Sequence, residues 1–506
     1  MQRFILAASV VTLALLIIAL PAIAADAPQL KSSHHEMSPA ATLGPQAIPA
    51  AVANPNYGLF TCQVGLTPGF KCYDPYQIRH AYNIDTVINA GYTGKGKTIV
   101  IVDAFQAPNI ASNLNFFNTF YGLPGLNGTG NPTDPNLGTF NQVAPDGLTP
   151  FDDTDGNQIG WAVEITLDVL YAHAMAPGAN IVLVLAKSND DSDILSATQY
   201  AVNHHLGDVI SQSFGENESC MDAGTLAAQH RTFTNATRRH ITLVASAGDD
   251  GAALRTCDGS SWVRAASSPA VDPLVLSVGG TALDAADYCL TALGCDPTAN
   301  PAFGTYLGEV VWNEPSDSGS GATGGGYSAL FRKPLYQFAF LPFNKRGRGV
   351  PDVAYTAAGN FAVLIYLDIP GLDVGYYTIS GTSVGAPQWS SIVALADQKA
   401  GRGLGFVNGS LYLFSLFPPF YKSMFHDVTE GNNSVTQFDS DDNPVNITGF
   451  NAGRGWDATT GLGSPKADQV VNAITFFTSD HDADDAIQSS DPDNDGRSGH
   501  HRMRPH

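Results

Sequence analysis

The amino-acid sequence predicts an α/β fold in three layers, with a central and mostly parallel sheet between helices on both faces. Short runs rich in Val, Ile and Leu are typical of strands buried on both faces, and they alternate along the chain with longer helix-like segments. This alternation indicates a parallel sheet covered by its crossover helices. The predicted strands are residues 98–103, 181–185, 209–213, 241–246 and 275–278, and the predicted helices are residues 159–174, 194–205 and 223–239.

The N-terminus has the pattern of a secretory signal. Arg3 precedes an apolar run at residues 4–20, and the Ala-Ile-Ala of residues 22–24 gives a small-residue cleavage site before Ala25. We therefore expect residues 1–24 to be a signal peptide and the protein to be secreted, either outside the cell or into a periplasm. No later run is long and apolar enough to span a bilayer, so no stable membrane association is expected after cleavage.

The composition divides the remaining chain into three parts. Residues 25–56 are rich in Ala, Pro and Ser and lack periodicity, which is typical of a linker. Residues 57–479 form the predicted globular domain. Residues 480–506 are polar, acidic and His-containing, and a disordered tail is predicted there.

Charge and cysteine content narrow the class of protein. The formal net charge of −22 and the isoelectric point near 4.7 argue against a nucleic-acid partner. Six cysteines in an exported chain predict three disulfides. Short separations favour Cys62–Cys72 and Cys289–Cys295 and leave Cys220–Cys257, although the sequence alone allows other pairings. No motif indicates a required partner, and a monomer is expected.

A candidate nucleophile lies in the segment Ser-Gly-Thr-Ser-Val-Gly-Ala-Pro at residues 380–387. A helix-like run at residues 388–400 follows it, so Ser383 is predicted at a helix N-terminus. There its hydroxyl would be exposed and close to unpaired backbone N–H groups. Those are two requirements of a serine nucleophile. The alternative is an ordinary helix cap.

Two acidic side chains lie four residues apart in the predicted helix 159–174. Glu164 and Asp168 share one face of a helix whose other residues are mostly apolar. Two carboxyls this close repel when both are ionised, so one pKa should rise and the pair should titrate as a unit. A solvated acidic stripe is the alternative, but charges are uncommon in so apolar a run.

A third acidic residue follows a predicted buried strand. Asp249 stands in the Gly-Asp-Asp-Gly of residues 248–251, where its carboxyl can point into the crevice at the C-terminal edge of the sheet. A protonated carboxyl can donate a hydrogen bond to an oxyanion. Taken alone, this motif would be interpreted as a loop turn.

Together these residues resemble the sedolisin (serine-carboxyl peptidase) family. Ser383 matches the family nucleophile, Glu164 its general base, Asp168 the acid that orients this base, and Asp249 the oxyanion-hole Asp. The resemblance runs from residue 73 to about residue 465. It implies a subtilisin-like form of the predicted fold, and a secreted, acid-active endopeptidase that cleaves proteins or peptides through a Ser acyl-enzyme.

The resemblance also implies one structural Ca²⁺. Oxygen ligands suit this ion, and glycines allow backbone carbonyls to converge. Without the resemblance, this part of the sequence indicates only a loop. The implied ligands are the side chains of Asp427 and Asp457 and the carbonyls of Val428, Gly453 and Gly455.

The sequence departs from the family pattern in one respect, and two other functions are possible. Sedolisins usually carry a long N-terminal prodomain, and only residues 25–56 precede the catalytic-like region here, so no long prodomain is expected. One alternative function is a neutral subtilisin-like peptidase that uses Asp103, His173 and Ser383. The other is a catalytically silent, calcium-stabilised binding protein on the same scaffold.

Overall fold

The computed structural model describes residues 36–53, 58–130, 133–293, 295, 300, 302–316 and 319–476. Its centre is an eight-stranded sheet with the order β16-β15-β11-β9-β6-β8-β7, and β21 also pairs with β15. Every pairing is parallel except that of β15 with β16. The strands are β6 Thr98–Ala104, β7 Phe140–Val143, β8 Asn180–Ala186, β9 Val209–Gln212, β11 Thr242–Ser246, β15 Val275–Ala285, β16 Tyr306–Val311 and β21 Val353–Thr356.

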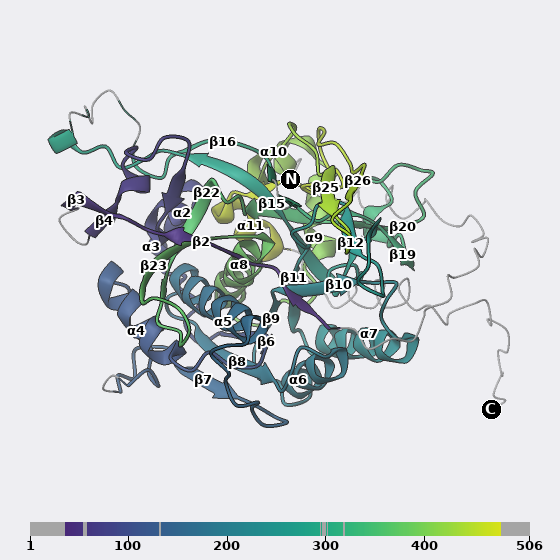
Figure 1. Cartoon of the computed structure of the whole chain (residues 1–506), viewed down its shortest axis with the longest axis horizontal. Helices are drawn as coiled ribbons and strands as arrows, with labels where there is room; N and C mark the ends of the chain where they lie inside the picture. The colour runs from purple at the N-terminus through teal and green to yellow at the C-terminus, as the bar shows by residue number, and fades with distance from the viewer. Residues whose placement is uncertain are drawn as a thin grey trace, which may run out of the picture.

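Helices cover both faces of this sheet (Figure 1). Ile99 and Ile101 of β6 pack into one apolar cluster with apolar side chains of α5 (Gly156–Met175) and α8 (Gly385–Ala400). Val100 and Val102 point the other way, into a second cluster with side chains of α6 (Asp191–Asn203) and α7 (Ala223–Arg238). Alternate side chains of a strand face opposite sides, so a continuous apolar run is buried only because both faces are covered.

Shorter elements surround the three layers. The remaining helices are α2 Pro75–Ala81, α3 Ile84–Asn89, α4 Ile110–Tyr121, α9 Asn408–Ser415, α10 Pro418–Met424 and α11 Ala467–Ile474, with 3-10 turns η1 Thr61–Gln63, η2 Thr291–Leu293, η3 Leu335–Gln337 and η4 Thr382–Val384. A four-stranded sheet has the order β2-β23-β22-β5, and a three-stranded sheet the order β1-β10-β14. These strands are β1 Ser38–Pro39, β2 Thr42–Gln46, β5 Lys71–Tyr73, β10 Phe214–Asn217, β14 Ser267–Ser268, β22 Phe361–Leu367 and β23 Gly375–Ser380.

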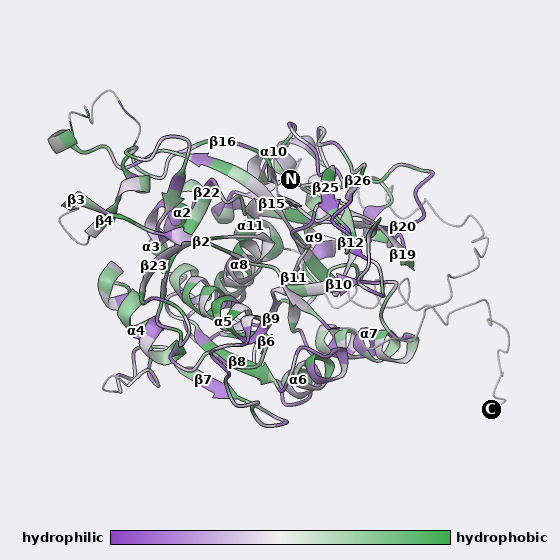
Figure 2. Cartoon of the chain, in the orientation of Figure 1, coloured by the Kyte–Doolittle hydropathy of each residue, from purple (hydrophilic) through white to green (hydrophobic). Residues whose placement is uncertain are grey.

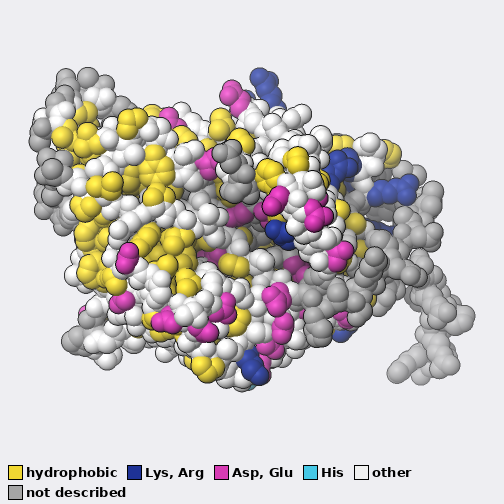
Figure 3. All heavy atoms as spheres, viewed as in Figure 1, with side chains coloured by type: hydrophobic (Ala, Val, Ile, Leu, Met, Phe, Trp, Pro, Cys, Tyr) yellow, Lys and Arg dark blue, Asp and Glu magenta, His cyan; other side chains and the backbone are white. Residues whose placement is uncertain are grey.

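The other strands form two-stranded ribbons. They are β3 Pro49–Ala53 with β4 Gly58–Phe60, β12 Ala253–Arg255 with β13 Trp262–Arg264, β17 Asn313–Ser316 with β18 Gly319–Ala322, β19 Gly326–Arg332 with β20 Gly347–Val350, β24 Phe425–His426 with β27 Ser464–Pro465, and β25 Val435–Phe438 with β26 Pro444–Ile447. Hydrophobic residues are frequent in α4 and β22 (Figure 2), and hydrophobic side chains gather on the surface over α4, β22 and β23 (Figure 3). There the rings of Phe116 and Tyr366 stack 3.9 Å apart.

The three-layer fold and the disulfides are confirmed. The predicted strands and helices are present, with ends shifted by a few residues, and β15 continues seven residues beyond the predicted end at residue 278. Cysteines 62 and 72, 220 and 257, and 289 and 295 are bonded as favoured. Among the described residues, no helix is both long and apolar enough to cross a membrane. The predicted signal peptide and acidic tail lie outside the described residues.

Part of the predicted linker forms strands in the structure. Within residues 25–56, the described residues 36–53 form β1, β2 and β3, and the first two pair with β10 and β23 of the domain. Backbone hydrogen bonds to two strand edges order this segment, and they need no side-chain periodicity. Composition alone therefore gave no signal for these strands.

Candidate active site

Four elements bring the candidate catalytic residues to the C-terminal edge of the parallel sheet. Glu164 and Asp168 lie on α5, which packs against α8 and η4. Ser383 lies in η4, between β23 and α8. Asp249 follows β11, and Asp103 is the last residue but one of β6. Parallel strands end at the same edge of a sheet, so residues far apart in the chain meet there.

Ser383 lies at the start of α8 as predicted, but it is not exposed. Its relative exposure is 0%. Its Oγ donates to the carbonyl oxygen of Ser213 at 3.3 Å, and its N–H donates to the carbonyl oxygen of Ala40 at 3.2 Å. The predicted exposure is thus wrong for this conformation, because residues 36–46 lie over the serine.

Glu164 and Asp168 form the coupled pair that their spacing predicts. Both are fully buried, and burial raises the pKa of each well above its usual value. The negative charge of Asp168 raises the pKa of Glu164 further, whereas a contact with the Ser383 hydroxyl opposes the rise. Asp168 Oδ1 accepts a hydrogen bond from Ser213 Oγ at 2.9 Å. Neither carboxyl oxygen of Glu164 makes a hydrogen bond of standard geometry to a described residue, but the carboxyl interacts with the Ser383 hydroxyl and with Asp168.

Asp103 adds a third buried carboxyl to this pair. It is 0% exposed, and neither of its carboxyl oxygens has a hydrogen-bond partner among the described residues. Burial and the charge of Asp168 raise its pKa. From the sequence, Asp103 is a candidate only for the neutral alternative, and its position beside Asp168 was not predicted. The sequence signal for this neighbourhood was the position of Asp103 near the end of a buried strand, because that end of β6 faces α5.

His173 does not belong to the site. It lies nine residues after Glu164 on α5, or about 14 Å along the helix axis. Its Nε2 bonds to the carbonyl oxygen of Pro124 at 2.7 Å, and burial lowers its pKa to about 4. The neutral alternative based on Asp103, His173 and Ser383 therefore lacks its base in this structure.

Asp249 bonds to Thr382, the residue before the serine. Its Oδ1 accepts hydrogen bonds from Thr382 N at 2.8 Å and from Thr382 Oγ1 at 2.7 Å. Its Oδ2 has no partner among the described residues. Burial raises the pKa of Asp249 to about 8 although the bonds from Thr382 oppose the rise, so this carboxyl is protonated in acid and can donate through Oδ2.

Gly381 makes room for this arrangement. Its φ is +117°, and a Cβ built on it would lie 2.3 Å from Asp249 Oδ2 and 2.3 Å from the carbonyl oxygen of Ala40. Any side chain here would therefore collide with both groups. The free carboxyl oxygen and the peptide carbonyl converge on this glycine.

The predicted calcium ligands are Asp427, Val428, Gly453, Gly455 and Asp457, and the structure brings the two carboxylates among them to the loop that carries the two glycines. Asp427 Oδ1 accepts from Gly455 N at 3.0 Å, and Asp457 Oδ2 accepts from Gly453 N at 3.0 Å. Two carboxylates thus converge on one glycine-containing loop, and this oxygen-rich donor set fits a hard cation such as Ca²⁺.

Comparisons with known proteins agree with this geometry. The model of the subtilase family matches residues 154–405, which include Glu164, Asp168, Asp249 and Ser383. Kumamolisin of Bacillus sp. (strain MN-32) is 32% identical over 412 residues, covering 79% of this chain and 63% of kumamolisin. Sedolisin of Pseudomonas sp. (strain 101) is 33% identical over 287 residues, covering 55% of this chain and 42% of that protein.

More distant sequences and a solved structure extend this relationship. Tripeptidyl-peptidase 1 of Homo sapiens is 28% identical over 339 residues, covering 62% of this chain and 52% of that protein. This chain thus spans less than two thirds of the length of each relative. The structure of Pseudomonas sedolisin, a serine-carboxyl proteinase complexed with two molecules of pseudo-iodotyrostatin, matches with a TM-score of 0.62 and 27% identity, covering 80% of this chain and 98% of that one. In its fold, its motifs and these relatives, the chain is similar to the sedolisin family.

Proposed function

We propose that this protein is an acid-active serine-carboxyl endopeptidase that hydrolyses peptide bonds through an acyl-enzyme on Ser383. One observation carries the proposal: the Ser383 hydroxyl contacts the buried carboxyl of Glu164, and Asp249, whose Oδ2 has no partner among the described residues, bonds to the adjacent Thr382. A nucleophile needs a base on one side and an oxyanion donor on the other.

The residues divide the reaction as follows. Glu164, as a carboxylate, takes the proton of Ser383 while Oγ attacks the peptide carbonyl. Asp168 orients Glu164 and shares the proton. Asp249 Oδ2 and the N–H of Ser383 stabilise the oxyanion. Glu164 then protonates the leaving amine, and water hydrolyses the acyl-enzyme by the reverse sequence.

This mechanism requires one ionised carboxyl, which acts as the base, and one protonated carboxyl, which acts as the donor, in the same site. The buried cluster of Glu164, Asp168 and Asp103 must carry a negative charge, because a fully protonated cluster has no base. Asp249 must keep its proton, which it loses as the pH rises through its raised pKa of about 8. Activity should therefore fall at both lower and higher pH, which gives a bell-shaped pH–rate profile. Repulsion among the three carboxyls of the cluster favours its singly charged form below neutral pH.

Endopeptidase action is supported by the chain that covers Ser383. Residues 36–46 enter on the β10 side and leave on the β23 side. A cleft that accommodates a chain on both sides of the serine can accept an internal bond of a longer substrate.

The proposal includes export and one structural Ca²⁺. The two converging carboxylates and the loop carbonyls of Val428, Gly453 and Gly455 would hold the ion. Bound Ca²⁺ would compensate the charges of Asp427 and Asp457 and link two loops. Export is supported by the signal-like pattern of residues 1–24 and by the three disulfides.

The test is hydrolysis of a denatured protein substrate from about pH 2 to 8. Wild type is compared with Ser383→Ala, Glu164→Gln and the control Ser390→Ala, which removes a helix hydroxyl bonded only to its own helix. We expect a maximum below pH 7 that both site variants abolish and the control retains. A neutral maximum that survives Glu164→Gln would favour a different base. No hydrolysis by folded wild type at any pH would favour the silent binding protein.

A further inference from the structure

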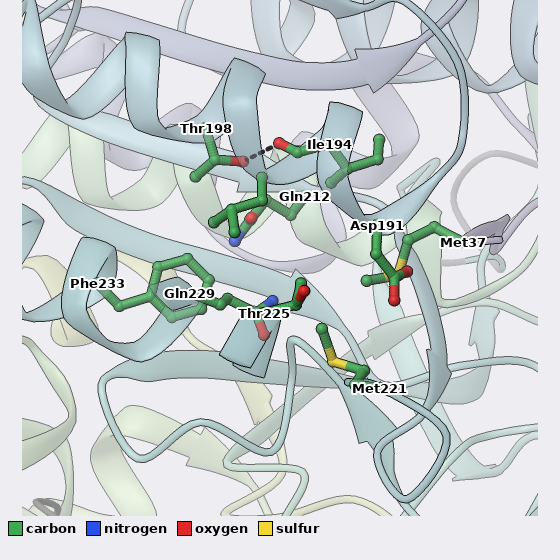
Figure 4. Close-up of a pocket in the computed structure, with 10 residues that line it drawn as sticks. Met37, Asp191, Ile194, Thr198, Gln212, Met221, Thr225, Gln229 and Phe233 are labelled. Atoms are coloured by element: carbon green, nitrogen blue, oxygen red, sulfur yellow. Dashed lines mark hydrogen bonds between the residues drawn. The ribbon is translucent and has the colours of Figure 1, made fainter. Parts of the chain in front are cut away.

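The loop between β19 and β20 carries apolar and basic side chains together at the surface. Residues 332–346 form this loop, which includes η3 and lies at the right of Figure 1 beside the labels of the two strands. The pocket between α6 and α7 is a different kind of feature. Met37, which directly precedes β1, lies at its Asp191 end (Figure 4), so this pocket belongs to the covered cleft already described.

The charge of the loop is opposite to that of the whole chain. The chain has 25 Lys and Arg against 47 Asp and Glu, yet residues 318–351 contain no acidic residue. The cations of this stretch are Arg332, Lys333, Lys345, Arg346 and Arg348. Arg348 is buried and paired with Asp352. The other four are exposed or half-buried and form no ion pair with a described residue, so the loop presents a basic surface on an acidic protein.

Three large apolar side chains of the loop face outward. Leu335, Phe338 and Phe343 are 63%, 59% and 93% exposed. Single exposed apolar residues are normal on protein surfaces, but here three of them lie within residues 335–343. Covering such side chains is favourable, and a cluster of them indicates a site of interaction.

Other side chains of the loop hold it in place. Gln337 Nε2 donates to Gly349 O at 2.8 Å, and Gln337 Oε1 accepts from Gly349 N at 2.9 Å. The rings of Tyr336 and Phe340 pack against Tyr412 of α9, with centroids 5.0 and 5.1 Å apart. The outward side chains are therefore not needed to fix the loop. A loop already held in one conformation also loses little freedom when it binds a partner.

The cations lie next to the apolar side chains. Lys333 Nζ lies 5.1 Å from the centroid of the Phe338 ring and donates to Pro342 O at 3.2 Å. Lys345 Nζ lies 4.7 Å from the centroid of the Tyr327 ring. In Figure 3, dark blue Lys and Arg side chains project at the right of the molecule, the side on which Figure 1 labels β19 and β20. Apolar and positive groups thus share one surface.

We propose that residues 332–346 bind the surface of an anionic phospholipid bilayer. Leu335, Phe338 and Phe343 enter the boundary between headgroups and acyl chains, and the four exposed or half-buried cations lie at the lipid phosphates. This contact is peripheral and reversible, so it differs from the stable membrane association that the sequence gives no reason to expect. The inference does not depend on the proposed peptidase function, because binding to a bilayer needs no catalysis.

The size of the surface favours a bilayer over a protein partner. Three side chains on one loop offer much less area than the roughly 800 Å² that each partner buries in a stable protein interface. A bilayer needs no matching shape, because its headgroups move around an inserted ring. The charge selects anionic lipid, since each Lys or Arg near a negative membrane surface strengthens binding about fivefold.

The first experiment measures binding of the full chain to vesicles by sedimentation. One set of vesicles contains phosphatidylcholine alone, and the other contains phosphatidylcholine with phosphatidylglycerol. We expect binding to the anionic vesicles that falls as salt is added, because salt screens the attraction between cations and lipid phosphates. Absence of binding to the anionic vesicles, or equal binding to the neutral ones, would overturn the proposal.

Two matched pairs of variants locate the contact. Phe343→Ser should lower the partition coefficient about tenfold, whereas Phe420→Ser, at a ring of α10 that is 53% exposed, should leave it unchanged. Lys345→Gln should lower it about fivefold, and Lys422→Gln, at an exposed residue of α10, should change it little. Unchanged binding of both loop variants would overturn the assignment to this loop.

A tryptophan in the loop distinguishes a bilayer from another anionic partner. Phe343→Trp keeps a large apolar ring and adds an emission that brominated acyl chains quench on contact. We expect anionic vesicles with brominated chains to quench this added emission. Absence of quenching, with binding that depends on Lys345 but not on Phe343, would indicate attraction to anionic groups alone and would overturn insertion into a bilayer.

The result is separable from the proposed peptidase function. Hydrolysis of a soluble denatured protein should be equal in Phe343→Ser and wild type, because the loop contributes no residue to the candidate active site. Vesicle binding without hydrolysis would support the loop assignment and count against the peptidase. Hydrolysis without vesicle binding would overturn the loop assignment and leave the peptidase function intact.

Discussion

The pH dependence of stability gives a sharp check on the burial of acidic groups. Glu218 follows β10 and is 1% exposed. Its carboxyl accepts hydrogen bonds from Ser328 Oγ at 2.5 Å and Ala329 N at 2.6 Å. Burial nevertheless raises the pKa of Glu218 from 4.5 to about 7. The folded protein therefore holds this proton more tightly than the unfolded chain does.

The sign and size of the effect follow from this difference. A raised pKa in the folded state contributes stability below pH 4.5, and the contribution is lost as the pH rises through about 7. A difference of about 2.5 pKa units corresponds to about 3 kcal/mol. Glu218→Gln keeps the shape of the side chain and removes the titration, so the variant should match its parent at pH 4.5 and exceed it by about 3 kcal/mol at pH 8.

Urea unfolding of Ser383→Ala protein, which cannot digest itself in the proposed mechanism, measures these free energies at both pH values. The exposed Glu430→Gln serves as the matched control and should change neither value. Equal stability of Glu218→Gln and its parent at pH 8 would refute the reasoning. So would a loss of stability in the variant at pH 8, because it would mean that the ionised carboxylate is favoured in the fold.

Three other predictions concern the site, the core and the metal. Asp249→Asn keeps a neutral N–H donor, so it should retain activity within about tenfold and lose the fall in rate at alkaline pH. Asp249→Ala has no donor and should lose about 100-fold or more of kcat. Equal losses of activity in the two variants would contradict donation by Asp249. Arg348 and Asp352 form a fully buried ion pair at 2.6 Å, so Arg348→Met should destabilise the protein by about 3–5 kcal/mol in urea unfolding, and a loss below about 1 kcal/mol would contradict the pair's role. Chelation of Ca²⁺ should lower Tm in wild type but not in Asp457→Asn, and an unchanged wild-type Tm would refute the site.

Local sequence predicted those parts of the fold that depend on neighbouring residues. Buried strands, helices and short-range disulfides leave periodic or spacing signals. The pairing of Glu164 with Asp168 is local too, because four residues make one helical turn. Contacts between distant segments left no such signal. Ala40 meets Ser383 across most of the chain, and Asp103 meets Asp168 only because β6 ends beneath α5.

In the proposed mechanism a carboxyl base takes the place of an imidazole base, and burial becomes part of the chemistry. In water a carboxylate is a weak base, with a pKa near 4.3. Removing Glu164 from water raises its pKa and strengthens it as a base for the Ser383 proton. The chain that lies over Ser383 completes this exclusion of water, since the serine has no exposed surface beneath it. A bound substrate strand would therefore strengthen the base that attacks it, and release of the product would admit water and weaken that base again. The segment over this site pairs with both β10 and β23, so it covers the serine from both sides.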